Sequence, residues 1–267
     1  MGRRGRPKRL KRGRRLRTLA TIVVVSAGLL ATCLAAGLLL CGLAGGPASG
    51  PKTAAIVDQV SQGDPNPAFV AASTEMLEEA GYAVDYYQGG DVTVDLYREL
   101  PTHDYDLLVL RVHSARLLED EQGNPLDEVV LFTSQPYSQG RYMEQGRGQL
   151  ARTRYHEGAE WLFGVRAGFI TWSMRGRFDG TTIIMMGCDG LTSINETARA
   201  FLAKGAGSFI SWDGPVSWSH SDPATERLIQ LMVVDGLSTK QAVARTMQEL
   251  GPDPAFDSQL LFYSSED

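Results

Sequence analysis

The chain has 267 residues and a formal net charge of −5, from 26 basic and 31 acidic side chains. These charges are unevenly divided, because residues 1–17 contain ten Lys or Arg and no acid. Removing these ten leaves 16 basic against 31 acidic side chains in residues 51–267, a net charge near −15. A segment that acidic is a poor ligand for nucleic acid, so we expect no nucleic-acid partner. Its roughly 215 residues are enough for one sizeable hydrophobic core.

An uncharged apolar run at residues 18–44 follows the basic arm. A helix needs roughly 20 apolar residues to cross a bilayer, so this run predicts a transmembrane helix that acts as an uncleaved signal-anchor. Lys and Arg stay on the cytoplasmic side, which makes residues 1–17 a cytoplasmic arm and places the C-terminal domain outside the cytoplasm. The arm would also bind anionic lipid head groups.

Two alternatives to the uncleaved anchor remain open. A cleaved signal peptide has an apolar region of only about 7–15 residues, but Ala48-Ser49-Gly50 would serve as a small-residue cleavage site. A lipoprotein would use Cys41, although the preceding residue, Leu40, is bulky where such motifs usually have a small residue.

After a Gly- and Pro-containing linker at residues 45–52, strands and helices alternate. We expect strands at 53–57, 82–86 and 105–112 and helices at 66–80 and 92–100. This β-α-β-α-β order predicts one α/β domain at 53–267, with a mostly parallel sheet and helices on both faces.

The pattern loosens between residues 117 and 180. There we expect one strand at 129–132 and an irregular excursion or mobile loop at 139–154. Order returns with strands at 181–186 and 207–212 and helices at 193–204, 222–235 and 238–250, the last with Ser238 as its N-cap.

Cysteine use limits the chemistry of the outer domain. Cys33 and Cys41 lie in the apolar run, which leaves Cys188 as the one cysteine beyond it. A single thiol cannot form an internal disulfide, and no paired Cys or His spacing suggests a zinc site. No Gly-rich phosphate loop follows any predicted strand, so we expect neither a metal nor a cofactor.

In open parallel sheets, functional sites form beyond the carboxyl ends of the strands. His113 follows the strand at 105–112 and Cys188 follows the strand at 181–186, so we expect both at one edge of the sheet although 75 residues separate them. A nearby imidazole generates or stabilises a nucleophilic thiolate. Gly187 would allow backbone N–H groups to approach and stabilise an oxyanion. The alternative is that both residues are structural, since an unpaired Cys is often simply buried.

This layout resembles the caspase–hemoglobinase fold of cysteine peptidases, which includes caspases, gingipains and the bacterial CHAT domains. In that family a His follows one core strand, usually as His-Gly, and the catalytic Cys follows the next. The matching residues are His113 in Leu-Val-Leu-Arg-Val-His-Ser and Cys188 in Ile-Ile-Met-Met-Gly-Cys-Asp-Gly. Residues 201–212 also resemble the CHAT segment that follows the catalytic Cys. The likeness covers about residues 53–250 and departs from the family at Ser114, where Gly is usual.

The resemblance implies a three-layer α-β-α sandwich and a Cys-His dyad that hydrolyses a protein or peptide substrate. Cys188 would attack the peptide carbonyl, His113 would protonate the leaving amine, and backbone N–H groups at Ser114 and Gly187 would hold the oxyanion. It also implies a substrate pocket that includes Trp212 at the end of the strand at 207–212.

Asp213 and Asp222 lie near that strand end and would select a basic side chain. Asp222 would alternatively be the N-cap of the helix at 222–235. A second function is an inactive, caspase-like module that binds a ligand or partner, which Ser114 and the exposure of a thiol outside the cytoplasm favour. The sequence indicates no oligomeric state.

Overall fold

The computed structural model describes residues 50–119, 123, 125–192 and 195–264. The basic arm and the predicted anchor lie outside these residues, so the membrane span stays a prediction. Within the part of the chain that is described, no helix is long and apolar enough to cross a bilayer.

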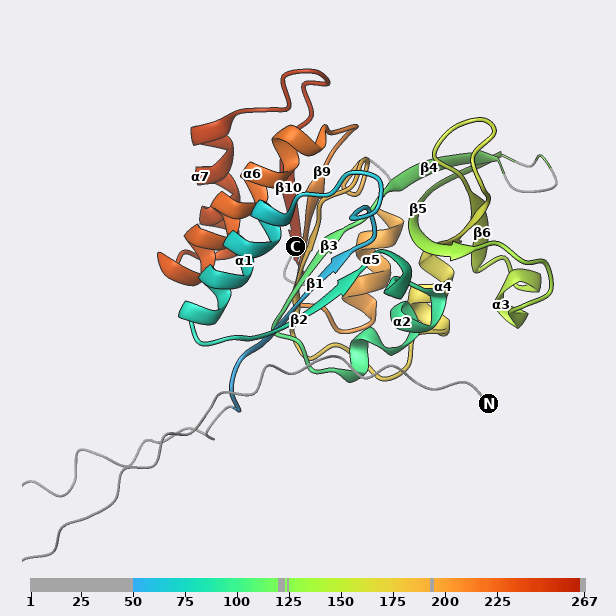
Figure 1. The fold of residues 1–267 in the computed structure, drawn as a ribbon, viewed down its shortest axis with the longest axis horizontal. Coiled ribbons are helices and arrows are strands. Elements are labelled where there is room, and N and C mark those ends of the chain that lie inside the picture. The colour runs from blue at the N-terminus through green and yellow to red at the C-terminus, as the bar shows by residue number, and fades with distance from the viewer. Residues whose placement is uncertain (1–49, 120–122, 124, 193–194, 265–267) are drawn as a thin grey trace, which may run out of the picture. The chain divides into compact units, whose positions relative to one another are not determined.

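A six-stranded sheet, sheet A, forms the centre of the fold (Figure 1). Its strand order is β2-β1-β3-β8-β9-β10, with every neighbouring pair parallel except β9 and β10. The strands are β1 (Thr53–Asp58), β2 (Ala83–Gln88), β3 (Leu107–Arg111), β8 (Thr182–Met185), β9 (Ser208–Trp212) and β10 (Leu260–Ser264). The predicted α/β class with a mostly parallel sheet is confirmed, and β10 is an addition that the sequence did not predict.

Helices cover both faces of sheet A, because its buried strands point alternate residues into two cores. Leu108 and Leu110 of β3 belong to the core that contains residues of α2 (Val94–Glu99), α4 (Ala167–Trp172) and α5 (Glu196–Ala203). Leu107 and Val109 belong to the core that contains residues of α1 (Pro67–Glu79), α6 (Trp218–Ile229) and α7 (Thr239–Leu250). The alternation continues beyond β3, so Arg111 and His113 lie on the α1 and α6 side.

The predicted start of the helix at 222–235 is wrong. Helix α6 begins at Trp218, with Ser217 as its N-cap residue, and a π-helical turn at Gln230–Val234 continues it. Asp222 therefore lies inside the helix rather than at its N-cap. Asp-Pro is a common helix start, but here the carboxylate of Asp222 binds a buried guanidinium instead of the helix N-terminus. The N-cap of α7 is Ser238, as predicted.

A second, antiparallel sheet occupies much of the region predicted to be loosely ordered. Sheet B has the order β4-β5-β7-β6, and short helix α3 (Met143–Gly146) precedes β6. Its strands are β4 (Ser114–Glu119), β5 (Pro125–Pro136), β6 (Leu150–Thr153) and β7 (Leu162–Val165). The expectation of a wholly irregular segment at 139–154 is wrong, because four-residue strands are too short to show a clear period in the sequence.

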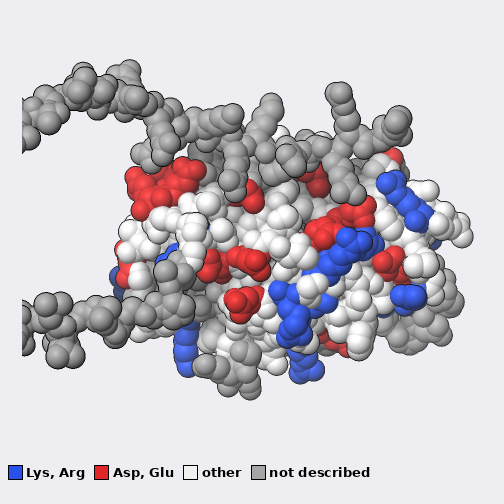
Figure 2. Space-filling view, turned by 90° about the horizontal axis from the view of Figure 1, so that it is seen from below, with Lys and Arg blue, Asp and Glu red and all other residues white. Residues whose placement is uncertain are grey.

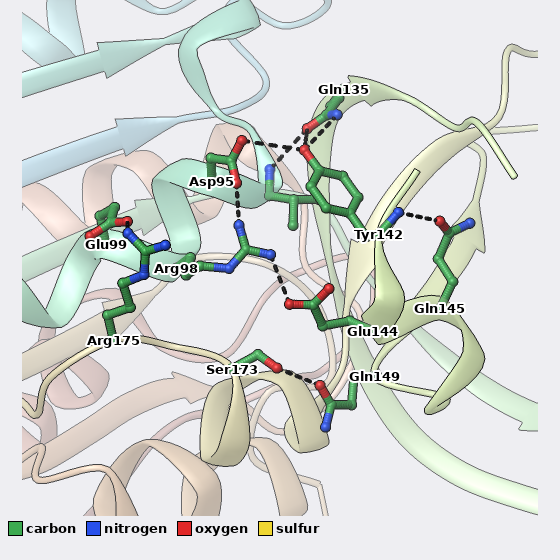
Figure 3. Close-up of polar contacts among 11 residues, drawn as sticks. Asp95, Arg98, Glu99, Gln135, Tyr142, Glu144, Gln145, Gln149, Ser173 and Arg175 are labelled. Atoms are coloured by element: carbon green, nitrogen blue, oxygen red, sulfur yellow. Dashed lines mark hydrogen bonds and ion pairs between the residues drawn. The ribbon is translucent and has the colours of Figure 1, made fainter. Parts of the chain in front are cut away.

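Arg98 links helix α2 to the α3 segment that leads into sheet B (Figure 3). Its guanidinium binds Asp95 on the same helix and Glu144 on α3, the latter at 3.0 Å. The guanidinium also lies 5.4 Å from the ring centroids of Tyr142 and Phe169, which extends the contact to α4. These contacts hold sheet B against the α2 side of sheet A.

The surface of the described residues carries charges of both signs. On the face that Figure 2 shows, basic and acidic side chains lie next to one another. Arg116 with Asp127 and Arg227 with Glu249 are examples of such surface ion pairs. Exposed pairs of this kind are screened by water and salt, so they affect solubility more than stability.

Two helix-ending glycines give a direct test of the backbone geometry. Gly81 and Gly205 both have positive φ, but their surroundings differ. A Cβ at Gly205 would lie 2.2 Å from the Phe178 carbonyl oxygen, whereas a Cβ at Gly81 would have no atom within 4 Å. We expect Gly81→Ala to lower the free energy of unfolding by about 1–2 kcal/mol and Gly205→Ala by about 3 kcal/mol or more. Equal losses in urea titrations would contradict this packing.

Candidate active site

His113 and Cys188 emerge at the same edge of sheet A. Strands β3 and β8 are parallel neighbours, paired from Leu107 with Thr182 to Leu110 with Met185. His113 follows β3 and Cys188 follows β8, so both leave the sheet at its carboxyl-terminal edge. The structure thus brings the two residues to neighbouring strand ends, as the sequence predicts.

The Cys188 thiol is half-buried and held by a backbone group. Its sulfur accepts a hydrogen bond from the Val216 N–H at 3.4 Å. Burial raises the pKa of Cys188, Asp189 and Asp253 raise it further, and the Val216 N–H opposes this shift. The thiol is therefore protonated at neutral pH in the resting protein.

The His113 ring stands among three aromatic rings. Its centroid lies 4.9 Å from Tyr155, 5.4 Å from Trp218 and 5.9 Å from Phe132, with the first two contacts close to edge-on. Burial lowers the pKa of His113, and Arg111 lowers it further while Asp64 opposes the shift. The imidazole is therefore neutral near pH 7, which is the form that accepts a proton from a thiol.

A close approach between the two strand ends requires Gly187. The Ser114 hydroxyl donates to the Cys188 carbonyl at 2.6 Å. A Cβ at position 187 would lie 2.5 Å from the Ser114 Oγ and 2.5 Å from the Val112 carbonyl oxygen, so a side chain there would push the segments apart. Gly187 is therefore required for the close packing of the two strand ends. Its expected part in stabilising an oxyanion stays a prediction.

The backbone of Ser114 suits the predicted oxyanion role. Phe132 N–H donates to the His113 carbonyl at 2.9 Å, and the pair after it in the antiparallel ladder is Ser114 with Leu131. Hydrogen-bonded and non-bonded pairs alternate in such a ladder, so the Ser114 N–H points out of it. The Asp189 N–H, in contrast, already has a partner, because it donates to the Gly214 carbonyl oxygen. Helix α5 begins only at Glu196, so its N-terminus does not directly follow Cys188.

One short segment, Val216–Trp218, contacts both candidate catalytic residues. Val216 binds the Cys188 sulfur, and Trp218 stands edge-on to the His113 ring. The segment is anchored in turn by Asp253, which accepts from the N–H and hydroxyl of Ser217 at 2.9 and 2.7 Å. Burial alone would raise the pKa of Asp253, but these and other backbone hydrogen bonds hold it below its usual value.

A buried ion cluster lies directly beneath His113. The Arg111 guanidinium binds Asp58 at 2.9 Å and makes a bidentate pair with Asp222 at 2.9 and 3.0 Å. Arg111 and Asp58 are both 1% exposed. Asn66 donates to Asp222 at 2.8 Å and Tyr86 donates to Asp58 at 3.1 Å, so the two carboxylates are also hydrogen-bonded from α1 and β2.

The three residues predicted to line a substrate pocket have different surroundings. Trp212 and Asp222 are 1% and 3% exposed, and the Trp212 Nε1 donates to Ser221. The carboxylate of Asp222 is committed to Arg111. Asp213 is exposed, and its Oδ1 accepts from the Gln259 N–H at 2.7 Å. Of the three, Asp213 is the one placed to meet a ligand.

A cavity of about 600 Å³ opens beside His113. Its lining includes His113, Gln59, Asp64, Ser134, Tyr155 and Glu160. Gln59 also accepts from the His113 backbone N–H at 3.0 Å, and its amide donates to the Tyr155 hydroxyl. Cys188 does not line this cavity, so the cavity adjoins the histidine side of the site.

Sequence reasoning missed Gln59, Tyr155 and Asp253. Gln59 directly follows β1 at the carboxyl-terminal edge of sheet A, so its place after a parallel strand is the signal that identifies it. Tyr155 and Asp253 come from loops without periodic pattern, so no local signal identifies them. No group of three or more His, Cys, Asp or Glu that would hold a metal ion occurs in the described ranges of the chain.

No protein-family model matches the chain, and no curated protein matches it by sequence.

The buried environment of the Cys188 thiol predicts how its rate of alkylation depends on pH. In a full chain with Cys33→Ala and Cys41→Ala, Cys188 is the only thiol, and we expect its rate of alkylation by iodoacetamide to rise with a midpoint above the free-cysteine value of about 8.5. A free-cysteine peptide is the control. A midpoint below 7 would show a preformed thiolate and contradict the buried, neutral state described above.

The ion cluster predicts unequal effects of its members on stability. Arg111→Met leaves two buried carboxylates without a cation, and we expect it to lower the free energy of unfolding by about 3–5 kcal/mol. The matched control Arg116→Met, in the surface pair with Asp127, should lower the free energy of unfolding far less. Similar losses in the two variants, measured by urea denaturation, would contradict the cluster.

Asp58→Asn should cost less than Arg111→Met and should depend on pH. Burial raises the pKa of Asp58 against the opposing effect of Arg111. The stability that this carboxyl contributes is therefore full below its unfolded pKa of about 3.9 and is lost as pH rises through its folded pKa. Asn does not titrate, so the destabilisation by Asp58→Asn should shrink as pH rises above the unfolded pKa. A destabilisation that grows as pH rises would overturn this assignment.

Proposed function

We propose that the chain is a membrane-anchored, caspase-like cysteine peptidase that hydrolyses peptide bonds with Cys188 and His113. The observation that carries the proposal is the contact of one segment, Val216–Trp218, with both the Cys188 sulfur and the His113 ring. That segment contacts a candidate nucleophile and a candidate base that leave neighbouring strands at one edge of the sheet, and nucleophilic catalysis needs such a pair close together.

The fold supports the family resemblance. Helices lie on both faces of a mostly parallel sheet, as in a three-layer α-β-α sandwich. His113 follows one strand and Cys188 follows its parallel neighbour, which is the order that the resemblance to the caspase–hemoglobinase fold implies.

The proposed reaction begins from a neutral pair. The neutral imidazole of His113 takes the proton of the Cys188 thiol, and the resulting thiolate attacks the peptide carbonyl carbon. The carbonyl oxygen becomes an oxyanion, which the outward N–H of Ser114 and the backbone at Gly187 would stabilise. His113 then gives its proton to the leaving amine, and water hydrolyses the thioester to release the acid and restore the thiol.

The proposed substrate is a peptide with a basic side chain, which would contact an acidic residue of the site. Asp213 is exposed beyond the end of β9 and would contact a basic side chain near Cys188. Asp222 has no such role in the proposal, because its carboxylate is bound by Arg111. With the predicted anchor at residues 18–44, cleavage would take place outside the cytoplasm close to the membrane.

A second candidate function is a binding or interaction module without turnover. The raised pKa of Cys188 favours it, since a protonated thiol is a weak nucleophile. The Ser114 hydroxyl also points to the Cys188 carbonyl at a position where the family usually has Gly.

Active-site labelling separates the two functions. We expect a panel of acyloxymethyl ketones carrying Arg, Lys or Asp to label the full chain, with labelling abolished in Cys188→Ala and reduced at least about 100-fold in His113→Ala. The full chain with Cys33→Ala and Cys41→Ala is the matched control and should keep labelling, because neither of these thiols belongs to the proposed site. Labelling that persists in Cys188→Ala, or no labelling of the wild-type chain by any probe, would overturn the peptidase proposal; the second result would favour the binding module.

A further inference from the structure

Trp218 lies between the buried ion cluster and the candidate catalytic histidine. It is the first residue of α6 and is half-buried. The Arg111 guanidinium lies 5.0 Å from the centroid of the Trp218 ring, and the His113 ring centroid lies 5.4 Å away at an interplanar angle of 79°. The indole therefore contacts a fixed cation and the His113 imidazole at the same time.

The Arg111 side chain is a rigid support for that indole. Its guanidinium is held by Asp58 and Asp222, and the Phe69 ring centroid lies 5.8 Å from it. Asp222 is four residues after Trp218, so both lie on one face of α6 and both bind Arg111. A cation over the face of a Trp ring is a favourable contact, which restricts the indole to this position.

A second aromatic ring limits the other side of His113. Tyr155 stands edge-on at 4.9 Å, and its hydroxyl accepts from the Gln59 amide. Gln59 also binds the His113 backbone N–H at 3.0 Å. The imidazole is thus held between two rings, each fixed by a buried polar group, and Trp218 is the ring that belongs to the segment contacting Cys188.

We propose that Trp218 is a positioning residue for His113, holding the imidazole toward Cys188 by resting on the Arg111–Asp58–Asp222 cluster. The catalytic consequence of this inference rests on the proposed peptidase function, but the positioning itself does not. A displacement of a catalytic group by about 1 Å can cost roughly 100-fold in rate, so a ring that fixes the imidazole has a measurable effect.

Titration of His113 tests the positioning without any need for activity. The titratable and charged groups that face this ring are Asp64, Arg111 and Tyr155, and Glu160 and His156 line the adjoining cavity. The pKa of His113 is measured by NMR of [13Cε1]-histidine in the full chain in detergent micelles, with its signal assigned among the four histidines by His113→Gln. In the wild type we expect a value below the ordinary value of about 6.5.

Trp218→Leu should move that pKa toward about 6.5, because water reaches the freed face of the imidazole, while Trp218→Phe should stay near the wild type.

Trp212→Leu is the matched control. Trp212 belongs to the core against which Trp218 packs, but it contacts His220. This variant should lower the Tm but leave the His113 titration unchanged. Arg111→Lys keeps the charge but loses the planar guanidinium, and should shift His113 in the same direction by less. Unchanged His113 titration in Trp218→Leu, or in Arg111→Lys if Trp218→Leu does not fold, overturns the inference.

Activity gives an independent reading. If an acyloxymethyl ketone labels the wild type at Cys188, Trp218→Leu should lower the maximal rate of labelling by that ketone at least about tenfold, with little change in the ketone concentration that gives half of this rate. Trp218→Phe should restore most of the maximal rate. A change in the half-saturating concentration alone would overturn the positioning role. Failure of the wild type to be labelled overturns the peptidase function instead, and the histidine titration still decides the role of Trp218.

Discussion

The bidentate pair between Arg111 and Asp222 is the interaction on which the arrangement of the site depends. It joins the central strand β3 to helix α6, and the further bond from Arg111 to Asp58 adds β1. A buried guanidinium must be paired, since removing a partner leaves an uncompensated charge in the core. The pair thereby holds α6 against β3. Trp218, the first residue of α6, lies against His113, and Val216, just before the helix, binds Cys188. The contacts around the candidate nucleophile and base thus depend on the buried ion pair of Asp222 with Arg111, which lies two residues before His113.

The same surroundings set the protonation of the resting site. Cys188 and His113 are both withdrawn from water, so burial disfavours the thiolate and the imidazolium alike. A neutral pair of this kind protects a lone thiol from oxidation, because the thiolate is the species that reacts. It also means that proton transfer must accompany substrate binding in the proposed mechanism. The cavity beside His113 is where a bound peptide would exclude water from that transfer.

The sequence predicts the parts of this structure that have strong periodicity or sit at strand ends. Five strands of sheet A, the helix stops at Gly81 and Gly205, and the meeting of His113 with Cys188 at one edge all follow from local pattern and from the geometry of parallel sheets. Most of sheet B does not, because β6 and β7 have only four residues each and β5 pairs with β7 rather than with β6, the next strand along the chain. Asp222 shows the limit most clearly: an Asp before Pro indicates a helix start, yet the distant Arg111 takes its carboxylate. An Arg within an apolar strand is itself a signal for such a buried partner, although the partner's identity is not readable from the chain.

The most direct test of the account is to trap the covalent intermediate. The full chain with Cys33→Ala and Cys41→Ala, in which Cys188 is the only thiol, is mixed with a panel of peptide 4-nitrophenyl esters, quenched with acid and analysed by intact mass spectrometry. The account predicts an acyl adduct that maps to Cys188, is released by neutral hydroxylamine as a thioester is, and is much reduced in His113→Ala. An adduct elsewhere in the chain, or none on Cys188 with any ester, would contradict it.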